Sequence, residues 1–595
     1  MSKILRINMT EMSTKWEDIP SDFETLAGRA FTSAVVNKEV DPKCHPLREK
    51  NKFVISPGLL AGTPAPSSGR LSVGGKSPLT GGIKEANAGG LTATKLSRIG
   101  VRGVVIEGSP KEDNWYSLLI RKGKCEIVKT NDYAGMGLYG LIKKIWEDYP
   151  NKPGIVGSGV AGQRLLRGAG VFGNNIENSD PGRYAGRGGL GAVLGSKRIV
   201  AVISDDKDGV RPEPKDKEAF EAGRKKFVAA LNAHAVTGKL KDDEGKPFGG
   251  LKNYGTNILQ NILSEAGGLP TRGFSSGRFD MAAKISGEAV HALVDETKEK
   301  FGDEAEGRYA HPCHPGCVIA CSNIVPYADT GKLHVSPLEY ESAWSLGSNL
   351  GIGVLHDVAE LNRLCNDLGL DTIEAGNTIA MFMEGGVIPY GDGPAAIELL
   401  KKAYDPESVE GKLVCSGAKI AGEALGVTRI PVVKGQSLPA YDPRPIRGIG
   451  VTYSTTPMGA DHTAGYTIAA EILGIKGEVT DPRGLDKSEL SRAFQATTAY
   501  IDSTGYCLFI AFCVLDDDDG FAGMKETVNS FLDKELDPTE YGLDILRNER
   551  DFNLKAGFTN KDDRLPEFFY TESLPPHNVV FEVSDEELDK VFEKM

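Results

Sequence analysis

Three of the nine cysteines fall within one short segment, His311-Pro-Cys313-His-Pro-Gly-Cys317-Val-Ile-Ala-Cys321. Thiolates in a short loop that contains glycine and proline can converge on one iron–sulfur cluster, which takes four protein ligands. A fourth ligand would then come from elsewhere in the chain. The alternatives are a zinc site and three buried thiols that bind nothing. Zinc sites usually pair their cysteines as C-x2-C, and this spacing is absent from the segment, so the pattern favours an iron–sulfur cluster.

Two similar hexapeptides suggest a ligand with two related halves. One is Asn366-Asp-Leu-Gly-Leu-Asp371, and the other is Asp502-Ser-Thr-Gly-Tyr-Cys507. The glycine of each permits a sharp turn close to a flat ligand. The carboxylate and amide oxygens can accept hydrogen bonds from a ring edge that is rich in N–H donors. The alternative is ordinary helix punctuation, in which the glycine ends one helix and the acid caps the next.

Two glycine-rich segments indicate a phosphate-bearing cofactor laid over a sheet. The first runs from Arg70 through Lys76 to Asn87-Ala-Gly-Gly, and the second is Ala185-Gly-Arg187-Gly188-Gly-Leu-Gly-Ala-Val-Leu-Gly-Ser-Lys. Successive glycines let backbone N–H groups form anion-binding nests, and arginine or lysine adds positive charge. Simple tight turns remain the alternative for each segment.

A third glycine motif is a poor candidate for nucleotide binding. Gly157-Ser-Gly159-Val-Ala-Gly162 fits G-x-G-x-x-G, but a dinucleotide fold also needs a βαβ unit with an acid about 20 residues further on. The next stretch is rich in glycine and asparagine, and Asp180 lies in a Pro-Gly turn. We therefore expect no nicotinamide site here.

Candidates for proton transfer are Glu339, Glu341 and His462. The two glutamates lie near an expected helix start, where carboxylates are favoured for structural reasons alone. The histidine lies in a glycine-rich loop, where an ordinary hydrogen-bonded histidine is the alternative. Signatures of nucleophilic hydrolases and of His-Glu-x-x-His metalloproteases are absent.

The elements that must position these residues change in character near residue 205. Short β-prone pieces separated by glycine, proline and serine precede it: Ile4–Ile7, Lys52–Ile55, Val101–Glu107, Trp115–Arg121, Cys125–Lys129 and Arg198–Ile203. Helical patterns follow it: Asp216–Ala235, Thr256–Ala266, Leu338–Leu350, Asp357–Leu368, Ala395–Tyr404 and Lys487–Ile501. We expect domains at 1–205, 206–425 and 426–595, and a C-terminal tail that packs through its aromatic residues.

Composition excludes several classes of protein. A net charge of −13 argues against nucleic-acid binding, which needs basic patches. Nine cysteines in 595 residues argue against a disulfide framework. No signal peptide and no run of about 18 apolar residues is visible, so we expect a cytoplasmic protein without a membrane span. Glycine is over-represented: 72 of the 595 residues are glycine, against a usual share of ~7 per cent. This excess is consistent with backbone held close to a bulky group.

In this order, the glycine-rich segments, the cysteine cluster and the two hexapeptides resemble the aldehyde:ferredoxin oxidoreductase family from about Ile4 to Phe569. The resemblance implies an α+β fold, in which a β-rich N-terminal pterin-binding base is capped by two mainly helical domains. It implies tungsten, or molybdenum, held by two pterins, one [4Fe–4S] cluster, and Mg²⁺ that bridges the pterin phosphates.

The resemblance also assigns roles to individual residues. It implies that Cys313, Cys317, Cys321 and Cys507 bind the cluster. It implies that the pterins and the magnesium are contacted by Arg70, Lys76, Asn87, Arg187, the backbone near Gly188, Asn366, Asp371, Asp502 and Leu508. Glu341 and His462 match the acid and the imidazole beside the metal, although Glu339 is a rival for the acid.

Three positions depart from the best-known archaeal members. The first cysteine spacing is C-x3-C instead of C-x2-C, which suggests a bacterial-type subfamily. Asn366 replaces an aspartate, so one pterin contact would use an amide oxygen. A Glu-x-x-His pattern linked to a subunit-bridging metal is missing, since Glu360 is followed by Asn362 and Arg363. A metal-bridged homodimer is therefore in doubt, although some oligomer remains possible.

The activity implied is the oxidation of a small-molecule aldehyde to its carboxylic acid, with electrons passed through the cluster to ferredoxin or a small iron–sulfur subunit. One alternative is a reductive relative, such as the tungsten subunit of an aryl-CoA reductase. Another is a non-catalytic iron–sulfur electron-transfer subunit that has lost its pterin.

Overall fold

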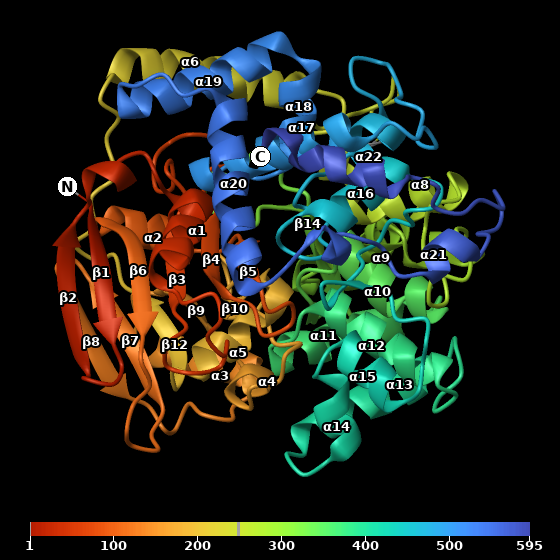
Figure 1. The fold of residues 1–595 in the computed structure, drawn as a ribbon, viewed down its shortest axis with the longest axis horizontal. Helices are drawn as coiled ribbons and strands as arrows, with labels where there is room; N and C mark the ends of the chain where they lie inside the picture. Colours follow the sequence, from red (N-terminus) through yellow and green to blue (C-terminus); the bar gives the residue numbers. More distant parts are fainter. Residues whose placement is uncertain (1, 247–249) are drawn as a thin grey trace.

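The computed structural model describes residues 2–246 and 250–595 and has two halves. Figure 1 shows the sheets of the N-terminal part, in red to orange, on the left and the green helices, such as α10, α11 and α12, on the right, while the blue helices α19 and α20 reach over the sheet side. The α+β class and the order of β-rich base and helical cap are as the sequence predicts.

The first of two six-stranded sheets is built from residues 3–107. Its strand order is β2-β1-β6-β3-β4-β5, and only β1 and β6 are paired in parallel. The strands are β1 (Lys3–Asn8), β2 (Ser13–Asp18), β3 (Phe53–Pro57), β4 (Leu71–Lys76), β5 (Ile83–Ala88) and β6 (Val101–Glu107).

The second sheet repeats this topology. Its order is β8-β7-β12-β9-β10-β11, and only β7 and β12 are paired in parallel, so each strand corresponds to the one six places earlier. The strands are β7 (Tyr116–Arg121), β8 (Lys124–Lys129), β9 (Gly154–Ser158), β10 (Val171–Gly173), β11 (Arg183–Ala185) and β12 (Ile199–Ser204). The N-terminal half is thus two copies of one six-stranded unit.

The alternation of side chains along the strands makes a four-layer sandwich. Phe53 and Ile55 of β3 join an apolar core with residues of the second sheet, whereas Val54 between them points the other way. Val54 packs under helix α1 (Gly28–Glu39), and the outer face of the second sheet packs under α3 (Leu138–Asp148) in the same way. The corresponding short helices between the last two strands of each unit are α2 (Thr92–Arg98) and α5 (Leu190–Gly195).

The second half is mainly helical. Its longer helices are α6 (Lys217–Ala233), α9 (Gly287–Phe301), α11 (Leu355–Leu368), α12 (Thr372–Glu384), α13 (Gly393–Lys401), α16 (Arg447–Thr455), α17 (Ser488–Thr504), α19 (Asp518–Leu532) and α20 (Pro538–Ala556). The shorter ones are α7 (Leu251–Tyr254), α8 (Leu259–Glu265), α10 (Tyr340–Leu346), α14 (Val409–Val414), α15 (Ala418–Ala424), α18 (Ile510–Asp516), α21 (Phe568–Thr571) and α22 (Asp585–Asp589). A small sheet of β13 (Arg308–His311), β14 (Ser322–Pro326) and β15 (Leu333–Val335) flanks the cysteine segment.

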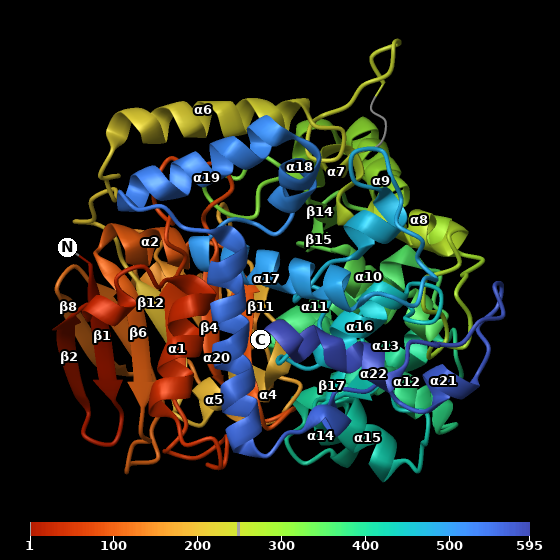
Figure 2. The ribbon, with the colours of Figure 1, turned by 45° about the horizontal axis from the view of Figure 1, so that its top comes forward.

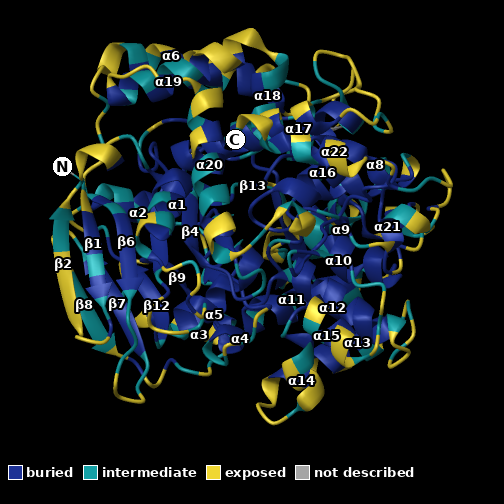
Figure 3. Ribbon diagram, viewed as in Figure 1, coloured by how far each residue is buried: buried dark blue, intermediate teal, exposed yellow. Residues whose placement is uncertain are grey.

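The helical half is fastened to the sheets at several places. Helix α20 packs on α17 and α1, and α6 lies beside α19 across one end of the molecule (Figure 2). Phe569 in the C-terminal tail is fully buried, which confirms that the tail packs. Burial is continuous from the sheets into the helical half (Figure 3). The domain boundaries at 205 and 425 stay predictions.

The rejection of a nucleotide fold at Gly157–Gly162 is correct. Strand β9 carries the motif and is followed by the single helical turn α4 (Val160–Gln163), but the next strand, β10, is antiparallel to β9. A βαβ unit requires parallel strands. The nine cysteines, all in the described part of the chain, form no disulfide. Within residues 2–246 and 250–595, no helix has the length and apolar character needed to cross a membrane.

Candidate active site

A large cavity lies where the sheets meet the helical half. Its empty volume is about 1750 Å³, including the open mouth. Twelve of the fifteen predicted site residues line it: Arg70, Asn87, Arg187, Cys313, Cys321, Glu341, Asn366, Asp371, His462, Asp502, Cys507 and Leu508. The structure therefore brings together residues that are dispersed over most of the chain.

Three predicted residues lie outside this lining. Cys317 stands immediately beside Cys313, and Gly188 lies one residue from Arg187. Lys76 is different, because its ammonium group donates to the carbonyl oxygen of Pro42, away from the cavity. Lys76 therefore lies apart from the residues that line the cavity, and its contact with a cofactor stays a prediction.

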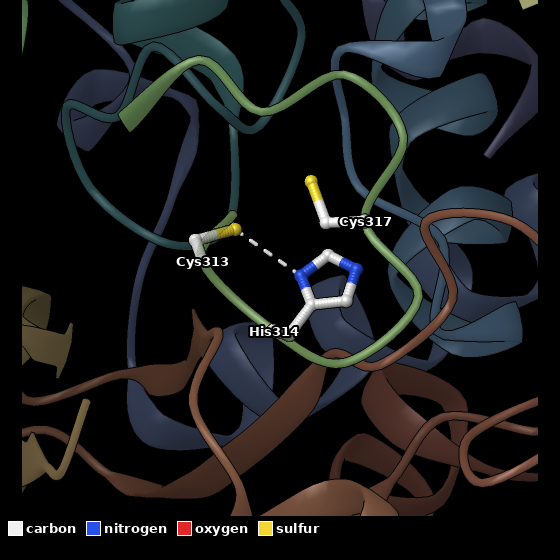
Figure 4. A group of neighbouring side chains, drawn as sticks. All are labelled: Cys313, His314 and Cys317. Atoms are coloured by element: carbon white, nitrogen blue, oxygen red, sulfur yellow. Dashed lines mark hydrogen bonds between the residues drawn. The ribbon is translucent and has the colours of Figure 1, made fainter. Parts of the chain in front are cut away.

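The cysteine segment folds into a loop that holds its thiols at one end of the cavity. The Sγ of Cys313 lies 3.1 Å from Nδ1 of His314, and the ligand atoms of Cys313, His314 and Cys317 lie within 4.8 Å of one another (Figure 4). Cys321 and Cys507 line the same cavity. Thiols from two distant segments therefore lie around this part of the cavity.

Ser67 joins the two segments that carry these thiols. Its carbonyl oxygen accepts a hydrogen bond of 2.8 Å from the backbone N–H of Cys507. Its own N–H donates to the carbonyl of Gly316, and its hydroxyl accepts from the N–H of Val318 at 3.2 Å. The fourth thiol is thereby positioned by the same loop that contacts the first three.

The electrostatics of the thiols suit a bound cation. Burial raises the pKa of Cys507 to about 11, and the hydrogen bond from the Cys317 thiol holds the pKa of Cys313 well below its usual value. Burial alone would lower the pKa of Arg70, but the neighbouring thiols of Cys507 and Cys313 raise it. Because like charges repel strongly when buried, four thiolates at this place require a positive group among them.

The two hexapeptides occupy equivalent positions on the duplicated sheets. Helix α11 ends at Gly369 (φ 80°), and α17 ends at Gly505 (φ 87°). A Cβ atom on Gly369 would lie 2.9 Å from Cα of Gly159, and one on Gly505 would lie 2.8 Å from Cα of Gly58. Gly58 directly follows β3, and Gly159 directly follows the corresponding strand β9.

The hydrogen bonds at the two contacts correspond as well. The N–H of Arg70 donates to the carbonyl of Gly505 at 3.1 Å, and the N–H of Gly170 donates to that of Gly369 at 3.0 Å. Arg70 and Gly170 each stand directly before the fourth strand of their unit. The two hexapeptides are therefore equivalent in structure, because the helices that end in them contact equivalent turns of the two sheets. Gly159 of the glycine motif is the contact point of the first of these helices.

Around the first hexapeptide, Arg187 connects three segments. Its Nε donates to Oδ2 of Asp371 at 3.2 Å, and its other nitrogens donate to the carbonyls of Ala460 (2.8 Å) and Ser437 (2.7 Å). Asp371 also caps helix α12 through Oδ1. Gly188 and Gly189 both have positive φ, 84° and 72°, which glycine adopts readily, and an anion-binding nest at this turn stays a prediction.

Around the second hexapeptide, acids face a buried arginine. Oδ2 of Asp502 lies 3.5 Å from Arg29, whose guanidinium also binds Glu549. Oε1 of Glu85 is buried and has no hydrogen-bond partner in the described part of the chain. Burial raises the pKa of Glu85 to about 8. Asn87 lies two residues on and accepts from Nε of Arg70 at 2.6 Å.

Glu341 and His462 meet in the cavity. Oε1 of Glu341 lies 3.3 Å from Nε2 of His462, while Oε2 accepts from the N–H of Ala440 at 3.1 Å. Burial raises the pKa of Glu341 to about 8 and lowers that of His462 to about 4. A neutral imidazole beside a carboxyl group whose pKa lies near neutrality is an arrangement that can accept and donate protons.

Glu339 is placed differently from Glu341. Its Oε2 accepts from the hydroxyl of Thr256 at 2.6 Å, and it lies close enough to Cys321 to raise the pKa of that thiol. The helix start therefore directs one glutamate to the imidazole and the other toward the cysteines.

Sequence reasoning missed several residues of the cavity. Tyr441 and Tyr466 pair through their hydroxyls at 2.9 Å beside His462, and Lys84 binds Asp461 at 2.6 Å. Asp461 adjoins His462 in the sequence, so its proximity could have been expected. The tyrosines and Glu85 carry no local pattern that distinguishes them.

Comparison with known proteins agrees with this geometry. The N-terminal domain of aldehyde ferredoxin oxidoreductase matches residues 4–206, and its domains 2 and 3 match residues 233–595. Tungsten-containing aldehyde ferredoxin oxidoreductases of Pyrococcus abyssi and Pyrococcus furiosus are 34% and 33% identical, each over 96% of this chain and 92% of the relative.

A solved structure shares the fold at lower identity. It is the active site complex BamBC of benzoyl coenzyme A reductase in complex with 1,5-dienoyl-CoA, with a TM-score of 0.78 and 16% identity over 100% of this chain and 93% of that one. The family models and the archaeal relatives cover nearly the whole sequence. The chain therefore belongs to the aldehyde ferredoxin oxidoreductase family.

Proposed function

We propose that this protein oxidises an aldehyde to its carboxylic acid in the central cavity, at tungsten or molybdenum held by two pterins, and releases two electrons through one [4Fe–4S] cluster. The overall reaction is R-CHO + H2O → R-COOH + 2 H⁺ + 2 e⁻. The observation that carries this proposal is the contact between Glu341 and His462 in the cavity that Cys313, Cys321 and Cys507 also line.

The residues present fit such a group. Two equivalent hexapeptides on duplicated sheets suit a ligand with two similar halves. The unpartnered Oε1 of Glu85 supplies a buried acceptor for a ring N–H. Four converging thiols supply the ligands that an iron–sulfur cluster needs. When bound, the metal–pterin group supplies the two-electron redox chemistry and an activated oxygen.

The proposed contacts follow from these positions. Asn366 and Asp371 would hold one pterin, and Asp502 with Leu508 the other. Arg70, Asn87 and the nest at Gly188 would face the phosphates and Mg²⁺. Arg187 is bound to Asp371 and to two carbonyls, so we assign it chiefly to holding the hexapeptide and the loop around Ala460 in place.

The proton chemistry belongs to Glu341 and His462. The Glu341 carboxylate accepts a proton from water or from the aldehyde hydrate. The depressed pKa of His462 keeps its imidazole neutral, so it can donate one hydrogen bond to the substrate oxygen. Glu339 faces Thr256 instead, which leaves Glu341 as the better candidate for the base.

Electrons would leave past Cys317. It is the least buried of the four cysteines and follows Gly316, which is exposed. A separate carrier, either ferredoxin or a small iron–sulfur subunit, would accept them there. Only one group of closely spaced cysteines occurs in the chain, so a second cluster must belong to a partner.

Two alternatives are weaker. The reductive one rests on a structure at 16% identity, against 34% for an aldehyde oxidoreductase. A subunit that only transfers electrons would not require a cavity of this size or a buried glutamate with a pKa of about 8.

The test is aldehyde-dependent reduction of a viologen dye by protein purified without oxygen. Reduction that depends on the aldehyde, with one carboxylic acid formed per two dyes reduced, supports the proposal. If protein that carries its metals leaves the dye oxidised with every aldehyde tried, the proposal is refuted.

A further inference from the structure

His314 lies inside the cysteine loop, and one of its ring nitrogens is directed at a thiol. Nδ1 of His314 lies 3.1 Å from Sγ of Cys313 (Figure 4), and the imidazole is fully buried. A thiolate that binds iron offers only lone pairs, so the hydrogen atom of this bond must lie on Nδ1. The imidazole is therefore the donor of the hydrogen bond, and the sulfur of Cys313 is its acceptor.

The other ring nitrogen of His314 makes no such contact. Nε2 is buried and has no hydrogen-bond partner among residues 2–246 and 250–595. A buried polar atom without a partner lowers the free energy of unfolding, and a phenyl ring of similar shape would not carry this cost. Packing alone therefore does not explain a histidine at this position. What the imidazole provides and a phenyl ring lacks is the hydrogen bond to Cys313.

The backbone at Gly69 holds the ring in place. A Cβ atom at residue 69 would lie 2.7 Å from Cδ2 and 3.1 Å from Cγ of His314, so the imidazole packs directly against this glycine. The next residue, Arg70, also lies beside the thiols, since Cys507 and Cys313 raise the pKa of its guanidinium against the effect of burial. Two side chains that donate hydrogen bonds therefore lie close to Cys313.

The neighbouring thiol of Cys317 is held differently. Its Sγ accepts from the backbone N–H of Ala320 at 3.3 Å, a donor that no substitution of the side chain removes. Cys313 lines the central cavity, whereas Cys317 does not. A side-chain donor thus acts on a thiol that faces the reaction site.

We propose that the hydrogen bond from His314 to Cys313 raises the reduction potential of the [4Fe–4S] cluster, so that the cluster takes up electrons from the central cavity more readily. This inference rests on the proposed function and deepens it by naming a residue that tunes the electron transfer. Each of the two electrons from the aldehyde adds one negative charge to the cluster. Because the added charge makes the cysteine sulfurs better acceptors, a donor at Sγ stabilises the reduced cluster more than the oxidised one.

The test is the midpoint potential of the cluster, measured by EPR while the holoenzyme is titrated with dithionite and mediators without oxygen. His314→Phe keeps a ring and removes the donor. His314→Asn is the matched control, because its amide carries an N–H group close to the position of Nδ1. In His314→Phe we expect the equilibrium constant for one-electron reduction to fall about tenfold, a shift of about 59 mV to lower potential. In His314→Asn it should stay within about twofold of the wild-type value.

A purely structural role would change other properties. We expect His314→Phe to keep the wild-type iron content and to lose no stability in denaturant unfolding, since it removes the buried nitrogen that has no partner. An unchanged potential in His314→Phe would overturn the inference. So would equal shifts in His314→Phe and His314→Asn, because the shift would then not depend on the donor.

Pulsed EPR of the reduced wild-type cluster tests the contact even if a variant fails to retain iron. In protein with isotopically labelled histidine, a weak nitrogen coupling supports the inference. The strong coupling of a nitrogen bound to iron, or no coupling at all, would overturn it. Neither measurement needs an aldehyde, so the two proposals can fail separately. If the holoenzyme oxidises no aldehyde but the potential falls in His314→Phe and not in His314→Asn, only the proposed function is refuted.

Discussion

Oε1 of Glu341 lies 3.3 Å from Nε2 of His462, although Glu341 lies in the first turn of helix α10 and His462 lies in a loop far along the chain. Folding brings a carboxyl group and an imidazole to one wall of the central cavity, and burial shifts their pKa values in opposite directions. This relationship is the basis of the predictions about proton transfer.

Replacing Glu341 by glutamine keeps the shape of the side chain and removes its basicity. We expect kcat to fall by about 100-fold or more, while metal content stays at the wild-type level. The measurement is steady-state turnover with parallel metal analysis. Glu339→Gln is the comparison, since Glu339 faces Thr256. Normal turnover in Glu341→Gln together with a large loss in Glu339→Gln would show that the wrong acid has been assigned.

The pH profile should report Glu341. A general base works only when deprotonated, and its pKa lies at about 8, so kcat/KM should rise with pH through that value. His462, with a pKa of about 4, stays neutral throughout the working range and adds no step there. A profile that is flat from about pH 6 to about pH 9, or one that keeps its rising limb in Glu341→Gln, would contradict this account.

Cys507 should be required for the iron–sulfur cluster. Cys507→Ala removes one of four converging thiols, so we expect loss of most of the iron and of electron transfer to the dye. Cys513→Ala is the matched control, because Cys513 is also buried, on the next helix, but lies outside the central cavity. Iron content and activity that survive in Cys507→Ala would remove this residue from the ligand set.

The glycine contact between Gly505 and Gly58 should be required for docking of the second hexapeptide. An alanine at 505 would be strained by φ and would press on Gly58, whereas Gly557 has positive φ but open space around it. Gly557→Ala therefore measures the conformational cost alone, about 1–2 kcal/mol. Gly505→Ala should destabilise the protein by clearly more than that in denaturant unfolding and should lower metal content. An equal decrease in the free energy of unfolding in the two variants would mean that the contact between Gly505 and Gly58 is not needed.

Much of the fold could be predicted from the sequence, because its signals are local. Short β-prone pieces between turn residues marked β3 and β12, and helical patterns marked α6 and α17. The duplication of the sheets could not be predicted, since corresponding strands share topology but little sequence pattern. It appears only when the pairing of β1 with β6 and of β7 with β12 is known.

The residues of the candidate site also fall into those that short sequence patterns reveal and those that only the fold reveals. Cysteine spacing and the repeated hexapeptide are short patterns, and they identified residues that the fold does bring together. The position of Lys76 outside the cavity lining could not be predicted, because a glycine-rich strand does not reveal which face its lysine occupies. Tyr441, Tyr466 and Glu85 were missed because their importance depends on neighbours that are distant in the sequence.

The most direct test of the whole account is the metal content of protein purified without oxygen. A metal–pterin centre with one [4Fe–4S] cluster predicts about one tungsten or molybdenum and about four iron per chain. Both metals should fall together with activity when the protein is exposed to a chelator under denaturing conditions. Protein that oxidises aldehydes without tungsten or molybdenum, or that carries zinc at Cys313, Cys317, Cys321 and Cys507 in place of iron, would contradict the account.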